Sequence, residues 1–315
     1  MEKIRIGVST CLMGEAVRYD GEHAHDRYLT NTLGQFVEFV PVCPEMEAGF
    51  GVPREPIRLV GNPASPRLMT VNTKKDLTDS MMTLARKRVR ELEVEDLSGF
   101  IFKSKSPSCG MERVKVYSAS GRPVKKGTGL FAKAFMAHFP LIPVEEDGKF
   151  HDPRLRENFF ERIFTLKRWR HTLAMRKSLA RLVAFHTAHK MLILSHSTKH
   201  YREMGKLVGR AKGKKITDIY NCYESLLVEA LGLRATVKKH SNVLRHMMGY
   251  FKKQLSSDEK QELLDVIRGY HDELLPLIVP ITLFKHSVRK YKEPFLATQL
   301  YLTPHPLELK LRNHA

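Results

Sequence analysis

The segment Ile4-Arg-Ile-Gly-Val-Ser-Thr-Cys11 decides the fold class of the first half of this chain. Its first six residues form a short, mostly apolar run that is typical of a buried β-strand. Similar runs occur at Val37–Val42 and Gly99–Lys103, and Leu77–Leu92, which has helical spacing, lies between them. Alternation of strands and helices predicts an α/β domain with a mainly parallel sheet.

Three further segments complete this expected domain. Leu68–Asn72 and Leu141–Val144 are candidate strands, and the glycine-rich stretch that begins at Gly127 leads into a helix ending near His138. In a parallel sheet, ligands bind beyond the carboxyl ends of the strands. We therefore expect the functional residues of this half in the loops that follow the strands.

The second half has a different pattern and predicts an all-α domain. The boundary is expected near residues 145–155, which gives an α/β domain at 1–148 and a basic all-helical domain at 149–315. Pro276 and Pro280 interrupt the apolar stretch near its end. Helical spacing is found at Asn158–Thr172, Lys177–Ser195, Ile216–Leu231, Val237–Leu255 and Ser257–Leu275.

Charge also divides the chain. Residues 1–150 hold 22 Lys and Arg against 19 Asp and Glu, a net charge of +3, whereas residues 151–315 hold 31 against 15, a net charge of +16. A strongly basic half predicts a polyanionic partner, and RNA is the candidate. The alternative is a solvated basic face, which we also expect to account for the pairs His186/His189 and His196/His200, since no H-E-x-x-H motif is present.

The sequence favours a cytoplasmic protein. No run of about 18 apolar residues is present, and the N-terminus lacks the features of a signal peptide. In a reducing compartment the four cysteines are expected to be thiols, available for metal binding or catalysis. Cys222 lies among apolar residues of a predicted helix and is expected to be a buried structural residue.

The other three cysteines share one context, because each follows a predicted strand. Loops after neighbouring parallel strands meet at one edge of the sheet, so Cys11, Cys43 and Cys109 are expected to converge. Thiolates suit iron–sulfur clusters, zinc and copper(I). Three ligands, rather than the four of a closed structural site, leave one metal position open. The alternative is that these cysteines are simply small buried residues at strand ends.

Polar groups beside the cysteines favour a functional site. Glu45 lies two residues after Cys43, and Lys103-Ser-Lys-Ser-Pro-Ser-Cys109 places hydroxyls and cations before Cys109. The motifs of this half are Ser9-Thr-Cys-Leu-Met-Gly14 with Val17-Arg-Tyr-Asp-Gly21, Val42-Cys-Pro-Glu45 with Gly49-Phe-Gly-Val-Pro-Arg54, and Lys105-Ser-Pro-Ser-Cys-Gly110.

These motifs, in this order, resemble the thiouracil desulfidase family over roughly residues 3–145. The resemblance implies a 4Fe-4S cluster held by Cys11, Cys43 and Cys109, with the fourth iron open to substrate. It also implies a catalytic carboxylate at Glu45 and an assisting hydroxyl at Ser106. The family's serine lies three residues before its last cysteine, which favours Ser106 over the neighbouring serines.

The implied activity is removal of sulfur from a thiolated pyrimidine such as 4-thiouracil, with C=S becoming C=O and sulfide released. Glu45 is expected to deprotonate the attacking water, and Ser106 to hold the water or the ring. Two alternatives use the same residues: a zinc protein built on the same cysteines, and a nucleic-acid-binding or RNA-modification protein whose metal is structural, zinc or Fe-S.

The remainder of the chain resembles a helical domain often fused behind desulfidase domains. The resemblance implies no chemistry there. The matching segments are Phe185-His-Thr-Ala-His-Lys190, Lys239-His-Ser-Asn-Val-Leu-Arg-His-Met-Met-Gly249 and Tyr301-Leu-Thr-Pro-His-Pro306.

Overall fold

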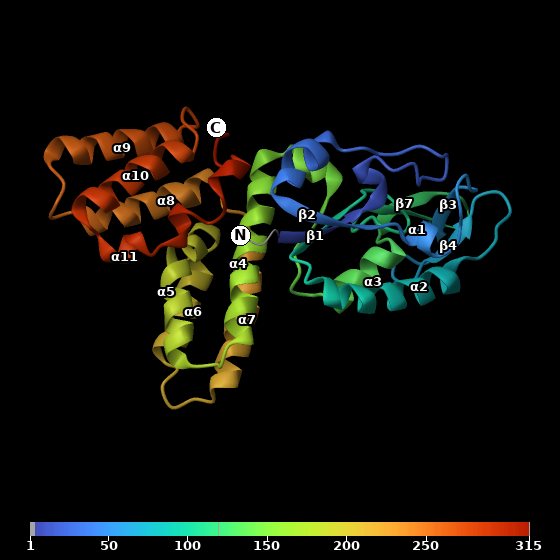
Figure 1. The fold of residues 1–315 in the computed structure, drawn as a ribbon, viewed down its shortest axis with the longest axis horizontal. Helices are drawn as coiled ribbons and strands as arrows, with labels where there is room; N and C mark the ends of the chain where they lie inside the picture. The colour runs from blue at the N-terminus through green and yellow to red at the C-terminus, as the bar shows by residue number, and fades with distance from the viewer. Residues whose placement is uncertain (1–3, 119, 315) are drawn as a thin grey trace. The chain divides into compact units, whose positions relative to one another are not determined.

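The computed structural model describes residues 4–118 and 120–314. The chain divides into two compact units, Met1–Asp152 and Pro153–Ala315. Figure 1 shows that strands occur in the first unit and that the second is built of helices. This arrangement confirms the predicted fold class, an α/β region followed by an all-α region.

The main sheet of the first unit has four parallel strands in the order β2-β1-β5-β8. The apolar segment that opens the chain forms β1 (Ile4–Ser9), which lies between β2 (Val37–Val42) and β5 (Gly99–Phe102). β8 (Val144–Glu146) pairs with β5 at the edge, three residues later than the predicted strand began. Because β1 is central, its neighbours bring their carboxyl ends to the same edge.

A second four-stranded sheet was not expected from the sequence. Its order is β4-β3-β6-β7, with β3 and β6 parallel and both outer pairs antiparallel. The segment predicted at Leu68–Asn72 is a strand, but it belongs to this sheet. The strands are only four or five residues long, too short for a distinctive periodicity: β3 (Ile57–Val60), β4 (Arg67–Thr70), β6 (Val114–Tyr117) and β7 (Pro123–Gly127).

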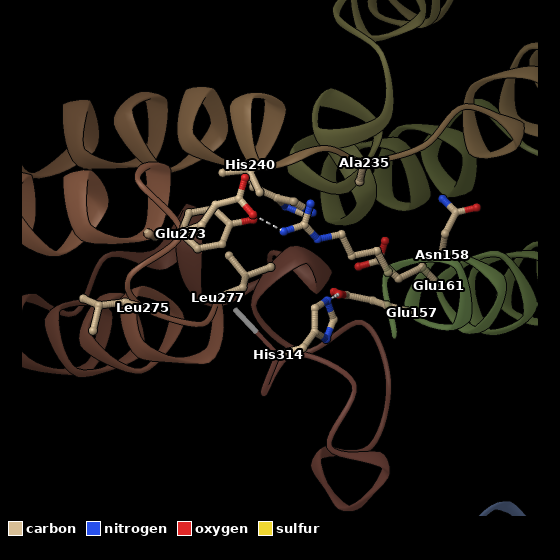
Figure 2. Close-up of a pocket in the computed structure, with 12 residues that line it drawn as sticks. Glu157, Asn158, Glu161, Ala235, His240, Glu273, Leu275, Leu277 and His314 are labelled. Atoms are coloured by element: carbon tan, nitrogen blue, oxygen red, sulfur yellow. Dashed lines mark hydrogen bonds and ion pairs between the residues drawn. The ribbon is translucent and has the colours of Figure 1, made fainter. Parts of the chain in front are cut away.

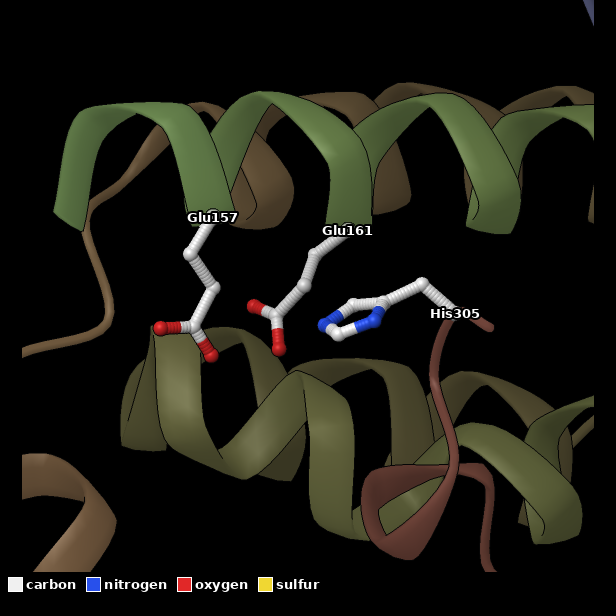
Figure 3. Close-up of side chains that lie close together, drawn as sticks. All are labelled: Glu157, Glu161 and His305. Carbon is white, nitrogen blue, oxygen red and sulfur yellow. The ribbon is translucent and has the colours of Figure 1, made fainter. Parts of the chain in front are cut away.

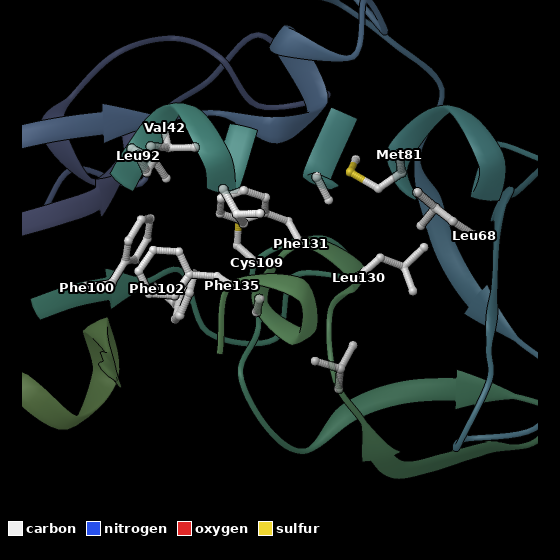
Figure 4. Close-up of a cluster of buried hydrophobic side chains, with 14 of the residues drawn as sticks. Val42, Leu68, Met81, Leu92, Phe100, Phe102, Cys109, Leu130, Phe131 and Phe135 are labelled. Carbon is white, nitrogen blue, oxygen red and sulfur yellow. The ribbon is translucent and has the colours of Figure 1, made fainter. Parts of the chain in front are cut away.

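Phenylalanine rings dominate the core of the first unit. Phe100 and Phe102, two residues apart on β5, share one face of the sheet, with ring centroids 4.2 Å apart. Phe135, on α3 (Leu130–His138), lies 4.6 Å from Phe100 between ring centroids (Figure 4). Full burial of one such side chain contributes about 1.5–3 kcal/mol. A side chain at Gly7 would collide with the Phe100 ring, which explains the glycine within β1.

The same core packs against the loop that carries Cys109. Cys109 belongs to the buried cluster, beside Phe131 in Figure 4. α2 (Thr78–Glu91) supplies Met81, Ala85 and Val89 from one face, at the i, i+4, i+8 spacing of an amphipathic helix. Four-residue α1 (Pro44–Glu47) follows β2 directly.

The second unit is helical. α5 packs against α6, α7 and α8, and so occupies its centre. α6 was not among the expected helices. The helices are α4 (Pro153–Ala174), α5 (Leu179–His196), α6 (Thr198–Gly209), α7 (Ile216–Gly232), α8 (Val237–Met248), α9 (Ser257–His271), α10 (Ile278–Tyr291) and α11 (Pro294–Ala297).

Side-chain caps fix where several of these helices begin. Ser178, Ser197 and Thr236 accept a backbone N–H of the first turn of α5, α6 and α8, and Ser256 forms a capping box with Glu259 at α9. Pro280 does not interrupt α10, because it lies in the first turn, where the N–H has no intrahelical partner. Within the described residues, no helix is long and apolar enough to cross a membrane.

Candidate functional site

The three strand-end cysteines line one cavity of about 490 Å³ in the first unit. Cys11 follows β1, Cys43 follows β2, and Cys109 lies in the loop after β5. Glu45 and Ser106 line the same cavity, so all five predicted site residues are brought together. Other lining residues are Ser9, Thr10, Val17, Arg18, Tyr19, Arg54, Lys103, Ser104 and Lys105.

The turn that carries Cys11 is closed by backbone hydrogen bonds. The carbonyl of Cys11 accepts the N–H of Gly14 at 3.4 Å and that of Ala24 at 2.9 Å. Gly14 has φ +93°, a left-handed conformation that costs a residue with a Cβ about 1 kcal/mol or more. This turn folds residues 10–26 back over the carboxyl end of β1.

Cys43 occupies the N-cap position of α1. Its backbone N–H donates to Oε1 of Glu47 at 3.0 Å, and Oε2 of Glu47 lies 3.0 Å from Nε of Arg88 on α2. Proline at the first helical position suits the helix start, because it removes an N–H that would have no partner. The short helix therefore fixes the position of Glu45 relative to Cys43.

The loop that holds Cys109 is braced by its own serine and by α3. Oγ of Ser106 accepts the N–H of Cys109 at 3.1 Å. The carbonyl of Ser108 accepts the N–H of Phe131 at 3.0 Å, which satisfies a first-turn donor of α3. A Cβ at Gly129 would lie 2.5 Å from the Ser108 carbonyl group, so this approach requires glycine.

The carboxylate of Glu45 is held from both sides. Nε of Arg54 donates to Oε2 at 3.1 Å, and the hydroxyl of Ser108 donates to Oε1. The arginine side chain is 6% exposed and that of Glu45 is 14% exposed, so the pair is shielded from solvent. Arg54 also donates to the carbonyl oxygens of Val17 and Gly51.

The sequence did not reveal these partners of Glu45. Arg54 belongs to a quoted motif but was given no role, and Ser108 was ranked below Ser106. In the structure Ser106 does not bind Glu45 directly. Its Oγ lies 3.0 Å from Oγ of Ser108, so Ser106 is linked to Glu45 through Ser108. The usable signal was that Arg54 is the only arginine in the Gly49–Arg54 motif.

Lys103 brings a cation to the cavity. Its ammonium lies 2.5 Å from Oδ2 of Asp147, and the N–H of Ser104 donates to Oδ1 of the same carboxylate at 2.8 Å. The N–H of Lys103 donates to Oγ of Ser9 at 2.9 Å, which joins the ends of β5 and β1. The Lys103 charge lowers the pKa of Cys11, opposing the larger effect of burial.

Burial keeps the three cysteines protonated when nothing compensates their charge. Burial, followed by repulsion from Cys43, raises the pKa of Cys11 to about 11. Burial also raises the pKa of Cys43, and burial and the Glu45 charge raise that of Cys109 well above its usual range. A cationic metal group would reverse this, because thiolates are the form that binds metals.

The donor set fits an iron–sulfur cluster. All four cysteines are free thiols, and the three in the cavity come from separate loops, which leaves the space between them open. Three soft donors suit a cluster, zinc or copper(I), and the cavity is larger than a single ion needs. Cys11, Cys43 and Cys109 are therefore the residues that could hold such a group.

Two sequence-based expectations about the second unit were wrong. Cys222 is exposed rather than buried, because the buried face of α7 carries Tyr220, Tyr223 and Leu227, and Cys222 points away from it. The paired histidines are not on a solvated face: His186, His189, His196 and His200 are all at least 90% buried.

Comparisons with known proteins place the first unit in a family. A family model described as 2-thiouracil desulfurase matches residues 6–147. YbbK, an uncharacterised protein of Bacillus subtilis (strain 168), is 31% identical over 130 residues, which are 40% of this chain and 85% of that protein. The chain belongs to the 2-thiouracil desulfurase family.

Further matches extend the comparison. A model described as a protein of unknown function, DUF1722, matches residues 190–306. YbgA, an uncharacterised protein of Escherichia coli (strain K12), is 32% identical over 133 residues, 42% of this chain and 79% of that protein. A solved structure of TudS, a [4Fe-4S]-dependent thiouracil desulfidase, is 26% identical, covers 48% of this chain and 95% of its own, and gives a TM-score of 0.40.

Proposed function

We propose that this chain is an iron–sulfur-dependent desulfidase that converts the C=S group of a thiolated pyrimidine, such as 4-thiouracil, to C=O and releases sulfide. One observation carries the proposal: in a member of the 2-thiouracil desulfurase family, Cys11, Cys43 and Cys109 line one cavity together with Glu45. A 4Fe-4S cluster on three thiolates would supply an iron with an open position, a Lewis acid suited to sulfur.

The protein's own part in this reaction is to position and activate water. Oε2 of Glu45 accepts two hydrogen bonds from Arg54 and Oε1 accepts one from Ser108, whereas a carboxylate has about four acceptor sites. Oε1 thus retains a site for a water molecule, whose proton Glu45 would take as oxygen adds to the ring carbon. The carbon keeps the oxygen, sulfide leaves, and no electron is gained or lost.

Ser106 serves this arrangement from the neighbouring loop. Its oxygen is already the acceptor for the N–H of Cys109, so it orients the ligand loop as well as lining the cavity. Lys103 and Arg18 add positive charge to the cavity wall, which favours a group with thiolate and sulfide character.

The proposal is tested by anaerobic purification of the full chain, counts of iron and acid-labile sulfide, and an assay of sulfide release from 4-thiouracil. We expect a brown protein whose iron is lost in Cys11→Ala, Cys43→Ala and Cys109→Ala. Cys222→Ala is the matched control and should keep its iron, because Cys222 is exposed on α7. A colourless protein containing zinc would reject the cluster, and loss of iron in Cys222→Ala would reject the three-cysteine ligand set.

The basic second unit favours RNA as the natural form of the substrate. Lys239 is not available to a phosphate, since its ammonium donates to the carbonyl oxygens of His196 and Arg234. Other cations of the second unit are exposed, among them Lys212, Lys214, Lys215, Arg234, Lys238, Arg245, Lys252 and Lys253. We infer that this unit binds thiolated RNA through phosphate contacts. If any polyanion displaces the bound RNA as well as the same RNA does, the unit has no specific RNA partner.

A further inference from the structure

The second unit buries a group of metal-type ligands that the desulfidase proposal does not use. Glu157 and Glu161 lie one turn apart on α4, so their carboxylates share one face of the helix. One ligand atom each from Glu157, Glu161 and His305 lies within 4.8 Å of the others. In Figure 3 the two carboxylates descend from α4 and the His305 ring points toward Glu161. His196, at the end of α5, brings Nε2 to 3.2 Å from Oε2 of Glu161.

Nε2 of His305 is buried without a partner among the described residues. Glu161 and His196 are 0% exposed, and His305 is 7% exposed. Oε2 of Glu161 and Nε2 of His196 face only each other, as an ion pair at 3.2 Å. Because buried polar atoms in native proteins are nearly always paired, the unpartnered Nε2 of His305 beside two carboxylates indicates a missing ligand.

The opposite ring nitrogens of both histidines are satisfied by backbone carbonyls. Nδ1 of His196 lies 2.7 Å from the carbonyl oxygen of Leu233, and Nδ1 of His305 lies 3.1 Å from that of Pro306. A carbonyl can only accept, so each Nδ1 carries the proton and each Nε2 of a neutral ring presents a lone pair. Metal-binding histidines are held in this way, with the distal N–H donated to a carbonyl.

Arg312 accounts for only half of the carboxylate oxygens. Its Nε lies 2.9 Å from Oε1 of Glu157, and its terminal nitrogen lies 2.6 Å from Oε1 of Glu161. The Oε2 atoms remain, one 3.5 Å from Nε2 of His314 and the other opposite His196. Two buried carboxylates side by side repel each other, and one arginine does not pair all their lone pairs.

The cluster also borders an enclosed space. A cavity of about 20 Å³ is lined by Glu157 and Glu161 from α4, by His240 from α8 and by His314 near the C-terminus (Figure 2). That volume holds about one water-sized particle. His240 is fixed on its other side by the hydroxyl of Tyr301, 3.0 Å from Nδ1. The cavity therefore has room for one water molecule beside the carboxylates but not for an organic ligand, and neither His196 nor His305 lines it.

We propose that Glu157, Glu161 and His305, with His196 paired to Glu161 beside them, bind one divalent transition-metal cation that holds the helical unit together. Imidazole nitrogen with carboxylate oxygen is a donor set for zinc, iron(II) and manganese(II), and it contains no thiolate. The ligands join α4 to the segment around His305, which is far away in sequence. The site lies in the second unit and is independent of sulfur removal.

The test compares the metal content of full-length chains, purified anaerobically, stripped with a chelator and reloaded in separate arms with Zn²⁺, Mn²⁺ or Fe²⁺. Glu161→Gln keeps the shape of the side chain but removes the carboxylate charge, and His305→Gln keeps a polar side chain of similar size but removes the imidazole. Glu229→Gln is the matched control, since its carboxylate also faces a buried histidine, His200, at 3.3 Å. The difference in metal content between the parent chain and each variant excludes metal bound in the cysteine cavity, because every chain retains that cavity.

We expect the parent and Glu229→Gln to bind one more equivalent of at least one cation than Glu161→Gln or His305→Gln. The same cation should raise the thermal midpoint of the helical unit only in the first two chains. Trp169, the single tryptophan, is buried in this unit and reports whether each variant is folded. Equal metal content in all folded chains, for all three cations, would overturn the proposal and make His196 an imidazolium paired with Glu161.

Discussion

Arg54 donates a hydrogen bond to the carboxylate of Glu45 inside the cavity that Cys11, Cys43 and Cys109 line. The guanidinium reaches Oε2, while Ser108 donates to Oε1 from the loop that carries Cys109. One carboxylate therefore joins two of the cysteine loops. Its position, more than its mere presence beside Cys43, is what makes it suitable to activate a water molecule.

Replacing the carboxylate tests its role directly. Glu45→Gln keeps the shape and a hydrogen-bond acceptor but cannot take a proton, so we expect desulfidation to fall by about 10²–10⁴-fold. Iron content and the visible spectrum should not change, because Glu45 is not a cluster ligand. Glu38→Gln, an exposed carboxylate on β2, is the control and should retain full activity. Full activity in Glu45→Gln would remove this residue from the mechanism.

Arg54 is expected to act through Glu45. Arg54→Lys retains a positive charge but loses the planar fork that contacts Glu45 and two backbone carbonyls at once. We expect kcat for 4-thiouracil to fall at least about tenfold, with iron content retained. Arg67→Lys, whose guanidinium pairs with Asp76 at the surface, should behave like the parent chain. Equal kcat in both variants would show that the buried pair does not position the carboxylate.

The three serines before Cys109 should separate by their contacts. The family motif predicts that Ser106→Ala weakens turnover more than Ser104→Ala, and the hydrogen bond from Ser106 to the Cys109 N–H supports this. The structure revises the expectation for Ser108, whose buried hydroxyl binds Glu45. We now expect Ser108→Ala to lower kcat as well. Steady-state sulfide release from the three variants decides the order, and unchanged kcat in Ser108→Ala would refute the revision.

The helical unit should lose stability in mild acid. Burial, followed by the Arg168 charge, lowers the pKa of His189 to about 3, and burial, followed by the Lys190 charge, lowers that of His186 to about 4. In the unfolded chain both titrate near 6.5. Between about pH 6.5 and 4 the unfolded state therefore binds more protons, and each group removes up to about 1.4 kcal/mol of unfolding free energy per pH unit.

Trp169 fluorescence in urea, with a chelator present, measures this effect in the helical unit alone. His189 is neutral for a structural reason, since Nε2 accepts from Nε of Arg168 at 3.1 Å and Nδ1 lies 2.8 Å from the Phe185 carbonyl oxygen. His189→Gln should flatten the pH dependence, whereas exposed His271→Gln should not. An unfolding free energy that is the same at pH 7.5 and at pH 5.5 would contradict the prediction.

The first 148 residues are expected to fold, bind iron and process free 4-thiouracil without the helical half. The members of the buried core cluster lie between Val40 and Val144, and the cavity residues between Ser9 and Cys109. A fragment of residues 1–152 is the comparison, because Asp147–His151 forms a 3₁₀-helix that the shorter fragment interrupts. If both fragments bind iron but fail on free 4-thiouracil, the helical half must complete the active site.

The sequence by itself placed the elements that have a clear pattern of apolar residues. β1 and β2 were placed to the residue, because apolar runs bounded by turn residues identify buried parallel strands. The order of three strand-end cysteines was sufficient to expect their convergence, since parallel strands end at one edge of the sheet. The second sheet was missed because its strands are only four or five residues long, too short to be distinctive, and because β7 is mostly exposed.

Only the tertiary structure decided which side chains meet. Glu45 is nine residues from Arg54 and 63 from Ser108, and nothing in the local pattern links them. The same holds for Glu161 and His305, 144 residues apart, which are buried together, and for His196, for which a solvated basic face was predicted and which is buried beside Glu161. Burial of a polar group depends on which helices pack over it. The sequence by itself therefore determined the cysteine site, and the packing of distant segments determined its carboxylate partners and the buried histidines.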